Sequence, residues 1–188
     1  MVIANGSSQK PIVQTKRLDL RDFEESDWVA VHEYGSNPHV VRYMDWGPNT
    51  EEETHRFIQK SIGYQAESPR IHYPLAIVIR EQNRLIGGCG VYVSNIESRI
   101  GWIGYCLNQQ FWGQGYATET ARSLLEFGFN NVNLHRIFAF CDPANVASAH
   151  VMEKIGMKYE GHFRDSVFSK GKWHDELYYA ILEKDWKI

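Results

Sequence analysis

Two glycines in the middle of the chain have the spacing of a phosphate-binding loop. Gly113 and Gly115 lie between a strand-like segment, residues 100–107, and a segment with helical periodicity. The apolar face of that helix is formed by Ala117, Ala121, Leu124, Leu125 and Gly128. A helix N-terminus carries unpaired N–H groups and the positive end of the helix dipole, and glycines let backbone approach an anion closely. The stretch therefore predicts a phosphate site.

Two well-known phosphate motifs do not fit this loop. A P-loop ends in Gly-Lys-Ser or Gly-Lys-Thr, which is missing after these glycines, and a dinucleotide fingerprint needs a third glycine where this chain has Thr118. The pattern that remains is Gln-x-x-Gly-x-Gly-x-Ala, starting at Gln110. It resembles the pyrophosphate-binding loop of the GNAT acetyltransferases. A glycine turn that only begins a helix is the alternative interpretation.

Composition limits the class of protein. The 188 residues, 43% of them apolar and 23% charged, predict one globular domain spanning 1–188. A net charge of −3 gives no basic footprint for nucleic acid. Apolar runs such as 75–79 are too short to cross a bilayer, and the N-terminus has no signal-peptide pattern. We therefore expect a cytoplasmic protein without nucleic-acid or membrane partners.

The cysteines support this expectation. Cys89, Cys106 and Cys141 are odd in number, widely spaced and embedded in apolar strand-like segments. Such thiols are usually buried and structural, and a reducing compartment suits them. No Cys/His group in the sequence has zinc spacing, so we expect no metal cofactor.

The order of elements predicts an α+β fold with a mixed, mostly antiparallel seven-stranded sheet and helices on both faces. After a loose start over 1–14, we expect strands at 17–21, 73–80, 84–93, 99–107, 134–141, 157–168 and 172–182. Helices are expected at 28–34, 50–66, from 117 onward, and at 145–155. A helical crossover joins the strands ending at 107 and 141, so these two should be parallel. The glycine loop would then lie at the break in the sheet topology where open sheets bind ligands.

Several motifs occur together in the order seen in one family. They are Thr15-Lys-Arg-Leu-Asp-Leu-Arg, Ile103-Gly-Tyr, the glycine loop, His135-Arg-Ile, Asn145-x-x-Ser148, Glu153-Lys-Ile-Gly-Met and Gly171-Lys-Trp-His-Asp. This set, covering about 15–186, resembles the ribosomal-protein N-acetyltransferase-like (RimJ/RimL type) branch of the GNAT superfamily. The resemblance implies a single GNAT-like domain that transfers acetyl from acetyl-CoA, as co-substrate, to an amine.

The resemblance also implies a set of coenzyme-binding residues. The pantetheine arm would pair with the strand segment Tyr105, Cys106 and Leu107, and a backbone N–H near Leu107 would polarise the thioester carbonyl. The pyrophosphate would be held by the loop, with Gln110, Trp112, Gly113, Gln114, Gly115, Tyr116, Ala117 and Thr118 as its members. Asn145 matches a residue that contacts the pantetheine arm, although a plain helix N-cap is an equally good interpretation.

The acid and base are harder to assign from the resemblance. Many members carry a tyrosine acid where this chain has Met152, so Ser148 is the acid candidate, unless its hydroxyl bonds only to backbone. Related sequences often carry a glutamate base where this chain has Trp102. The remaining base candidates are His174, Asp175 and Glu160, and Tyr105 acting through water.

The acceptor side is predicted in the loop 43–48 and the helix that follows it. Tyr43 and Trp46 could flank a substrate channel, together with His174, although core packing also explains aromatic residues in a long loop. The leading acceptor is a protein N-terminal α-amino group. The alternatives are a small amine (an antibiotic, a polyamine or a metabolite), or a non-catalytic module that only binds acetyl-CoA. A homodimer is a further expectation of the resemblance.

Overall fold

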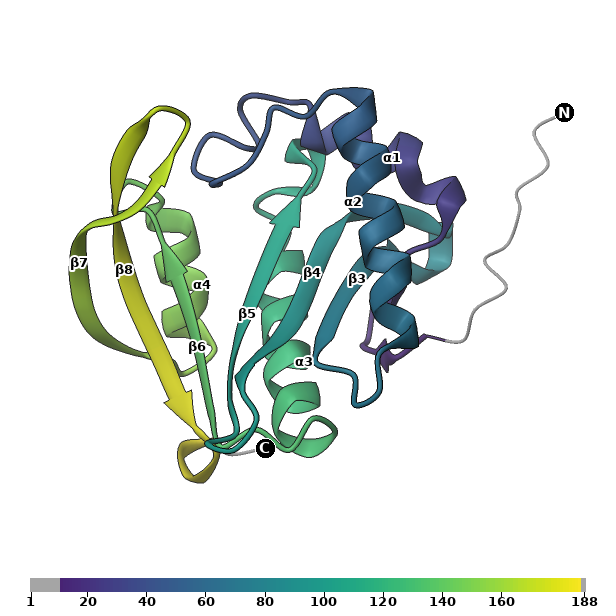
Figure 1. Cartoon of the computed structure of the whole chain (residues 1–188). Helices are drawn as coiled ribbons and strands as arrows, with labels where there is room; N and C mark the ends of the chain where they lie inside the picture. The colour runs from purple at the N-terminus through teal and green to yellow at the C-terminus, as the bar shows by residue number, and fades with distance from the viewer. Residues whose placement is uncertain (1–10, 187–188) are drawn as a thin grey trace, which may run out of the picture.

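The computed structural model describes residues 11–186 and contains one mixed sheet (Figure 1). Its eight strands follow the order β1-β2-β3-β4-β5-β6-β8-β7. Their bounds are β1 Val13–Gln14, β2 Leu18–Asp22, β3 His72–Ile79, β4 Arg84–Asn95, β5 Ile100–Leu107, β6 Arg136–Cys141, β7 Lys158–Ser169 and β8 Lys172–Leu182. Among the strands of residues 11–186, only β5 and β6 pair in parallel, and every other neighbouring pair is antiparallel. The predicted fold class and the parallel pair are confirmed.

The expected number of strands was too low by one. The segment assigned to a loose start contains β1, whose Val13 lies opposite Leu20 of β2. Thr15 makes this possible, because its hydroxyl accepts a hydrogen bond from the Leu18 N–H at 2.8 Å and turns the chain back on itself. A two-residue strand is too short to show the alternation on which a sequence prediction depends.

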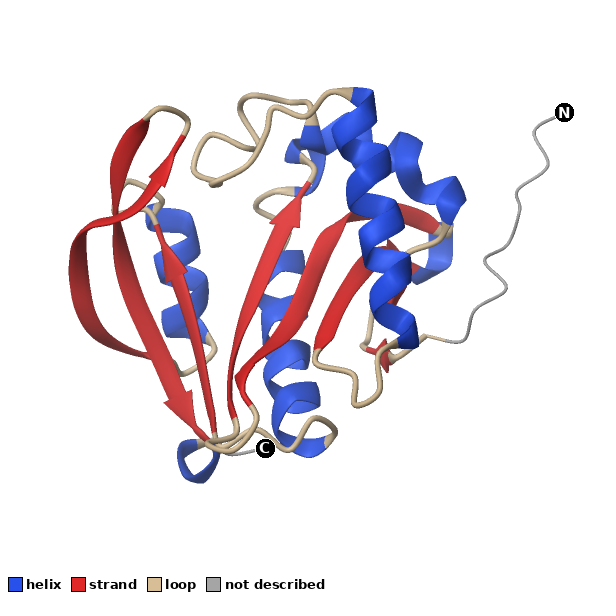
Figure 2. Cartoon of the chain, viewed as in Figure 1, coloured by secondary structure: helices blue, strands red, loops and turns tan. Residues whose placement is uncertain are grey.

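Residues 11–186 contain four α-helices. Figure 2 shows helices on both sides of the sheet. They are α1 Trp28–Gly35, α2 Glu51–Gly63, α3 Tyr116–Asn130 and α4 Val146–Lys154. One buried cluster joins α1 and α2 to β3, and a larger one joins α3 and α4 to the opposite face of the sheet. Among the helices of residues 11–186, none is long and apolar enough to cross a membrane.

Helix starts follow local chemistry. Thr50 caps α2 through a capping box with Glu53, as the acidic first turn suggests. Asn145 caps α4, with its side chain accepting from the Ser148 N–H. By contrast, Asp27 occupies the N-cap position of α1 but makes no side-chain cap bond to this helix, and instead pairs with Arg21 at 2.7 and 2.8 Å. A buried guanidinium needs a charge partner, and this need outweighs the weaker capping bond.

Glycines in β4 allow close packing on the α1–α2 side. A Cβ on Gly88 would lie 2.9 Å from the Tyr34 hydroxyl, and one on Gly90 would lie 2.7 Å from the ring of Tyr92. Tyr92 in turn stacks on Trp102 of β5, with ring centroids 4.2 Å apart. The glycines therefore leave room for the Tyr34 hydroxyl and for the ring of Tyr92.

Candidate active site

The strands β5 and β6 separate within the sheet. Their pairing begins with Ile100 opposite Arg136 and ends with Trp102 opposite Phe138, although β5 continues to Leu107. The Arg99 carbonyl accepts hydrogen bonds from residues at the start of β6, whereas the Asn108 N–H donates a hydrogen bond to β4. Backbone groups alternate in direction along a strand, so those of the odd-numbered residues in β5 point toward β6. Beyond the last pair, the N–H groups of Tyr105 and Leu107 therefore face a gap. An extended ligand could pair with this free edge as an added strand.

The glycine loop follows the end of β5 and leads into α3. Gly113 and Gly115 have φ of +72° and +81°, a conformation in which a side chain would be strained. Gly115 is the N-cap of α3 and, having no side chain, provides no cap bond to the first N–H groups of this helix. No heavy atom lies within 4 Å of the position that a Cβ on Gly113 would take. The loop is an exposed backbone surface with the positive end of a helix dipole.

Side chains hold this loop at its start. The indole N–H of Trp112 donates to the Leu107 carbonyl at 2.8 Å, although the side chain is 47% exposed. The Gln114 amide donates to the Gln110 carbonyl at 3.0 Å, and the Gln110 side chain accepts from Arg84 at 3.1 Å. In this structure, hydrogen bonds of Gln110 and Trp112 thus stabilise the loop conformation.

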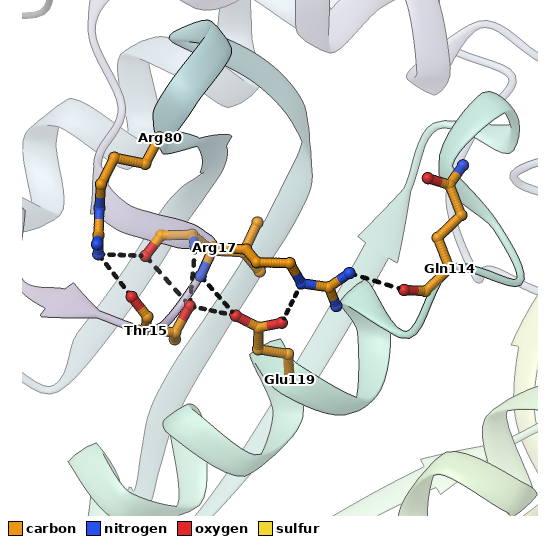
Figure 3. Close-up of polar contacts among 6 residues, drawn as sticks. Thr15, Arg17, Arg80, Gln114 and Glu119 are labelled. Carbon is orange, nitrogen blue, oxygen red and sulfur yellow. Dashed lines mark hydrogen bonds and ion pairs between the residues drawn. The ribbon is translucent and has the colours of Figure 1, made fainter.

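A charged cluster joins the loop to the first strands (Figure 3). The Glu119 carboxylate accepts from the Thr15 hydroxyl at 2.6 Å, from the Arg17 backbone N–H at 2.9 Å and from Arg17 Nε at 2.7 Å. Burial opposes ionisation of Glu119, but these hydrogen bonds outweigh it and lower the pKa of this carboxyl. Arg17 Nη1 also donates to the Gln114 carbonyl at 3.0 Å.

A tyrosine and a serine meet on the α4 side of the gap. The Tyr105 hydroxyl of β5 lies 3.1 Å from the Ser148 hydroxyl in the first turn of α4. Burial raises the pKa of Tyr105 to about 12, although the hydrogen bond with Ser148 acts in the opposite direction. The phenol therefore stays protonated at ordinary pH. Met152, one turn further along α4, is 1% exposed and packs in the core, and its thioether has no proton to donate.

A cavity of about 970 Å³ opens on the α1–α2 side of β5 and extends to the hairpin of β7 and β8. The predicted site residues that line it are Tyr43, Trp46, Tyr105, Cys106, Asn145, Ser148 and His174. Lys170 at the hairpin turn donates to the Val41 carbonyl at 2.7 Å, which joins the hairpin to the α1–α2 loop above the cavity. Burial lowers the pKa of Lys170, and nearby Asp45 opposes this effect.

The base candidates separate in the structure. His174 lines the cavity, with Nε2 3.2 Å from the Ser169 carbonyl and Nδ1 3.7 Å from the Asp142 carboxylate. Asp175 also lines it but is bonded to His162 at 2.7 Å. Glu160 pairs with Arg136 and is not among the cavity residues. His174 is the candidate that best combines access to the cavity with a charged neighbour.

The predicted residues thus form two groups. The cavity joins the acceptor candidates to Tyr105, Cys106, Asn145 and Ser148, whereas Leu107 and the loop residues 110–118 lie beyond its lining. Sequence reasoning missed two features: the direct contact between Tyr105 and Ser148, and the attachment of Arg17 to the loop. Arg17 belongs to a motif quoted for family resemblance, but its partners lie about a hundred residues away, as with Glu119 at a separation of 102.

These features fit a ligand that has an extended arm and a diphosphate. The gap offers backbone N–H groups for the arm, and the loop offers unshielded N–H groups at a helix N-terminus for the anion. Within residues 11–186, no group of three or more His, Cys, Asp or Glu side chains is placed to hold a metal ion. The expectation that no metal takes part stays a prediction.

Comparison with known proteins agrees with this geometry. The family model described as acetyltransferase (GNAT) domain matches residues 17–158. A Bacillus subtilis (strain 168) protein, uncharacterized N-acetyltransferase YnaD, is 42% identical over 176 residues, which cover 93% of this chain and 98% of that protein.

Two solved structures are similar to the whole fold. RimL, a ribosomal L7/L12 α-N-protein acetyltransferase in complex with coenzyme A, has a TM-score of 0.80 at 23% identity, covering 92% of this chain and 98% of its own. The spermidine N-acetyltransferase from Vibrio cholerae, in complex with CoA and spermine, has a TM-score of 0.78 at 23% identity, covering 91% and 98%. At this identity the two structures show a shared fold.

Proposed function

This chain belongs to the GNAT family of acetyltransferases, and from that premise we propose that it acetylates a primary amine, with a protein N-terminal α-amino group as the leading acceptor. The observation that carries the proposal is the separation of β5 from β6 immediately before the glycine loop. Acetyl-CoA supplies the thioester whose acetyl group is transferred. Its pantetheine arm would lie along Tyr105, Cys106 and Leu107, and its diphosphate against the N–H groups of loop 112–118.

The chain's own residues would supply the rest of the chemistry. The Leu107 N–H faces the gap and is the group we assign to polarising the thioester carbonyl. The Ser148 hydroxyl would protonate the leaving sulfur, and the Tyr105 hydroxyl, 3.1 Å away, would pass its proton to Ser148. Asn145 uses its Oδ1 to cap α4, which leaves its Nδ2 to donate to the pantetheine arm.

The proton lost by the amine needs a second acceptor, and we assign this role to His174. We expect His174→Gln to lower kcat/KM about 100-fold, because an amide retains the hydrogen bond to Ser169 but cannot take up a proton. His135→Gln is the control, since His135 lies near Glu183 at the other end of β6. A wild-type kcat/KM in His174→Gln would assign the base elsewhere.

A second acceptor class is favoured by the charge of the cavity. Five acids line it, namely Asp45, Glu53, Asp142, Asp175 and Glu176, against the two lysines Lys60 and Lys170. This excess of negative charge suits a small polycationic amine such as a polyamine. Such an acceptor should show a KM that rises with salt concentration, since screening weakens its attraction to the cavity.

Release of the CoA thiol with a panel of amines tests the proposal. The panel contains a peptide with a free N-terminus, the same peptide with a blocked N-terminus and an internal lysine, spermidine and an aminoglycoside. Turnover of the free peptide alone supports the leading acceptor, and turnover of spermidine supports the second class. Tight binding of acetyl-CoA in calorimetry without turnover of any amine would favour a module that binds the coenzyme but does not catalyse.

The cellular setting is part of the same proposal. All three cysteines are free thiols, which agrees with a reducing cytoplasm. We also propose that residues 1–188 form one domain and that the enzyme pairs as a homodimer without nucleic-acid or membrane partners. Light scattering after size-exclusion chromatography measures the mass of the assembly directly, and a monomeric mass would contradict the dimer.

A further inference from the structure

Arg17 contacts the glycine loop on both sides of Gly115. Its Nη1 donates to the Gln114 carbonyl at 3.0 Å, and its guanidinium lies 4.2 Å from the centre of the Tyr116 ring. Its Nε is bonded to Glu119, one turn into α3, at 2.7 Å. As Figure 3 shows, the Arg17 side chain extends from the turn between β1 and β2 to the loop, where it binds the Glu119 carboxylate and the Gln114 carbonyl. One planar group thus fixes the loop to the helix that follows it.

The bond to Gln114 sets the orientation of one peptide group. In a trans peptide the C=O and the next N–H point in opposite directions. Because the Gln114 carbonyl points to Arg17, the Gly115 N–H points away from it. In the sheet order, β2 and the gap between β5 and β6 lie on opposite sides of β5. The Gly115 N–H is therefore directed away from the Arg17 side. Gly115 has no Cβ to restrict its φ, which is +81° here, so other orientations of this peptide are accessible when such a bond is missing.

We propose that Arg17 is a positioning residue of the coenzyme loop: by binding the Gln114 carbonyl, it holds the Gly115 N–H in the orientation that receives the diphosphate of acetyl-CoA. The inference rests on the proposed function, since it requires the diphosphate to bind at this loop. Arg17 itself does not need to touch the coenzyme. Its effect should therefore depend on whether the acetyl donor carries a diphosphate.

Two acetyl donors separate this role from a general structural one. S-acetylpantetheine has the thioester and the pantetheine arm of acetyl-CoA but no diphosphate. For Arg17→Met we expect calorimetry to show CoA binding about tenfold weaker, the loss expected for one charge-assisted hydrogen bond. The KM for acetyl-CoA should rise by a similar factor with kcat little changed, and kcat/KM for S-acetylpantetheine should stay at the wild-type value.

Arg80 provides the matched control. Its side chain is 40% exposed against 39% for Arg17, and its Nη2 donates to the Thr15 carbonyl at 2.6 Å, within the same cluster but without a bond to the loop. Arg80→Met should leave CoA binding unchanged. Arg17→Lys keeps a cation beside Glu119 but cannot bond in the same plane to the Gln114 carbonyl. It should melt near the wild-type temperature and still bind CoA more weakly.

The measurements distinguish failure of the proposed diphosphate site from failure of the inference about Arg17. A wild-type enzyme that binds CoA and pantetheine equally well would overturn the diphosphate site, and the inference with it. A wild-type enzyme that prefers CoA, with unchanged affinity in Arg17→Met, would overturn the inference alone. An equal loss of kcat/KM for both acetyl donors in Arg17→Met and Arg17→Lys would assign Arg17 a structural role instead.

Discussion

Gly115→Trp is expected to weaken acetyl-CoA binding by at least about 100-fold in calorimetry, a loss of about 2.7 kcal/mol. Gly115 has a φ of +81°, which costs an L-residue about 1–2 kcal/mol, and its Cβ would point to Arg17 Nη2 at 3.4 Å. An indole at this position would displace the guanidinium, and the change in backbone conformation would rotate the N–H groups at the start of α3. Both effects act on the site proposed for the diphosphate.

The chain offers a control with the same strain. Gly171, in the turn between β7 and β8, has a φ of +78°, and a Cβ added to it would meet no heavy atom within 4 Å. Gly171→Trp adds the same side chain to the same backbone conformation away from the loop. It should lose stability in thermal melts but retain acetyl-CoA binding. Equal binding by wild type and Gly115→Trp would place the coenzyme away from the glycine loop.

The second large effect is expected at the hydroxyl pair of Tyr105 and Ser148. Ser148→Ala should lower kcat about 100-fold, since a general acid typically contributes a factor of this order or more. Tyr105→Phe should cause a similar loss, and the double variant should lose little more, because the two hydroxyls would act as one proton path. Binding of acetyl-CoA should change little in all three variants.

Two further readouts test the same pair. Burial raises the pKa of Tyr105 to about 12, so its proton is retained and kcat should not fall through loss of this proton between neutral pH and pH ~10. Ser123→Ala is the control, because it removes a buried hydroxyl of α3 that bonds only to the Thr120 carbonyl. Additive losses in the double variant would mean that Tyr105 and Ser148 act independently.

Most of the fold could be predicted because local signals were strong. Gly-rich and Pro-rich breaks separated apolar strands, and a helix between β5 and β6 required a parallel pair. The left-handed conformation of Gly113 and Gly115 agrees with the loop pattern. The missing strand β1 has two residues, too few for a periodic signal, and its turn depends on a hydrogen bond to Thr15.

The candidate site was harder to predict because its parts come from distant segments. Ser148 and Tyr105 were each named, but sequence spacing gives no measure of the 3.1 Å between them. Arg17 looked like one residue of an alternating strand, and only the tertiary fold brings it to Gln114 and Glu119. The binding and catalytic roles assigned to individual residues remain predictions that the variants above test.

The position of β8 between β6 and β7 has a consequence for biosynthesis. During translation, residues up to Ser169 emerge before any of β8, so β6 is an unpaired sheet edge and β7 has no partner strand at that stage. Unpaired edges invite association with other chains. β8 also carries His174, so one wall of the cavity proposed for the acceptor forms only when the last strand inserts. The glycine loop is therefore synthesised well before this last wall of the cavity, and ribosome-bound chains halted before residue 172 should depend on chaperones that shield β-strand edges.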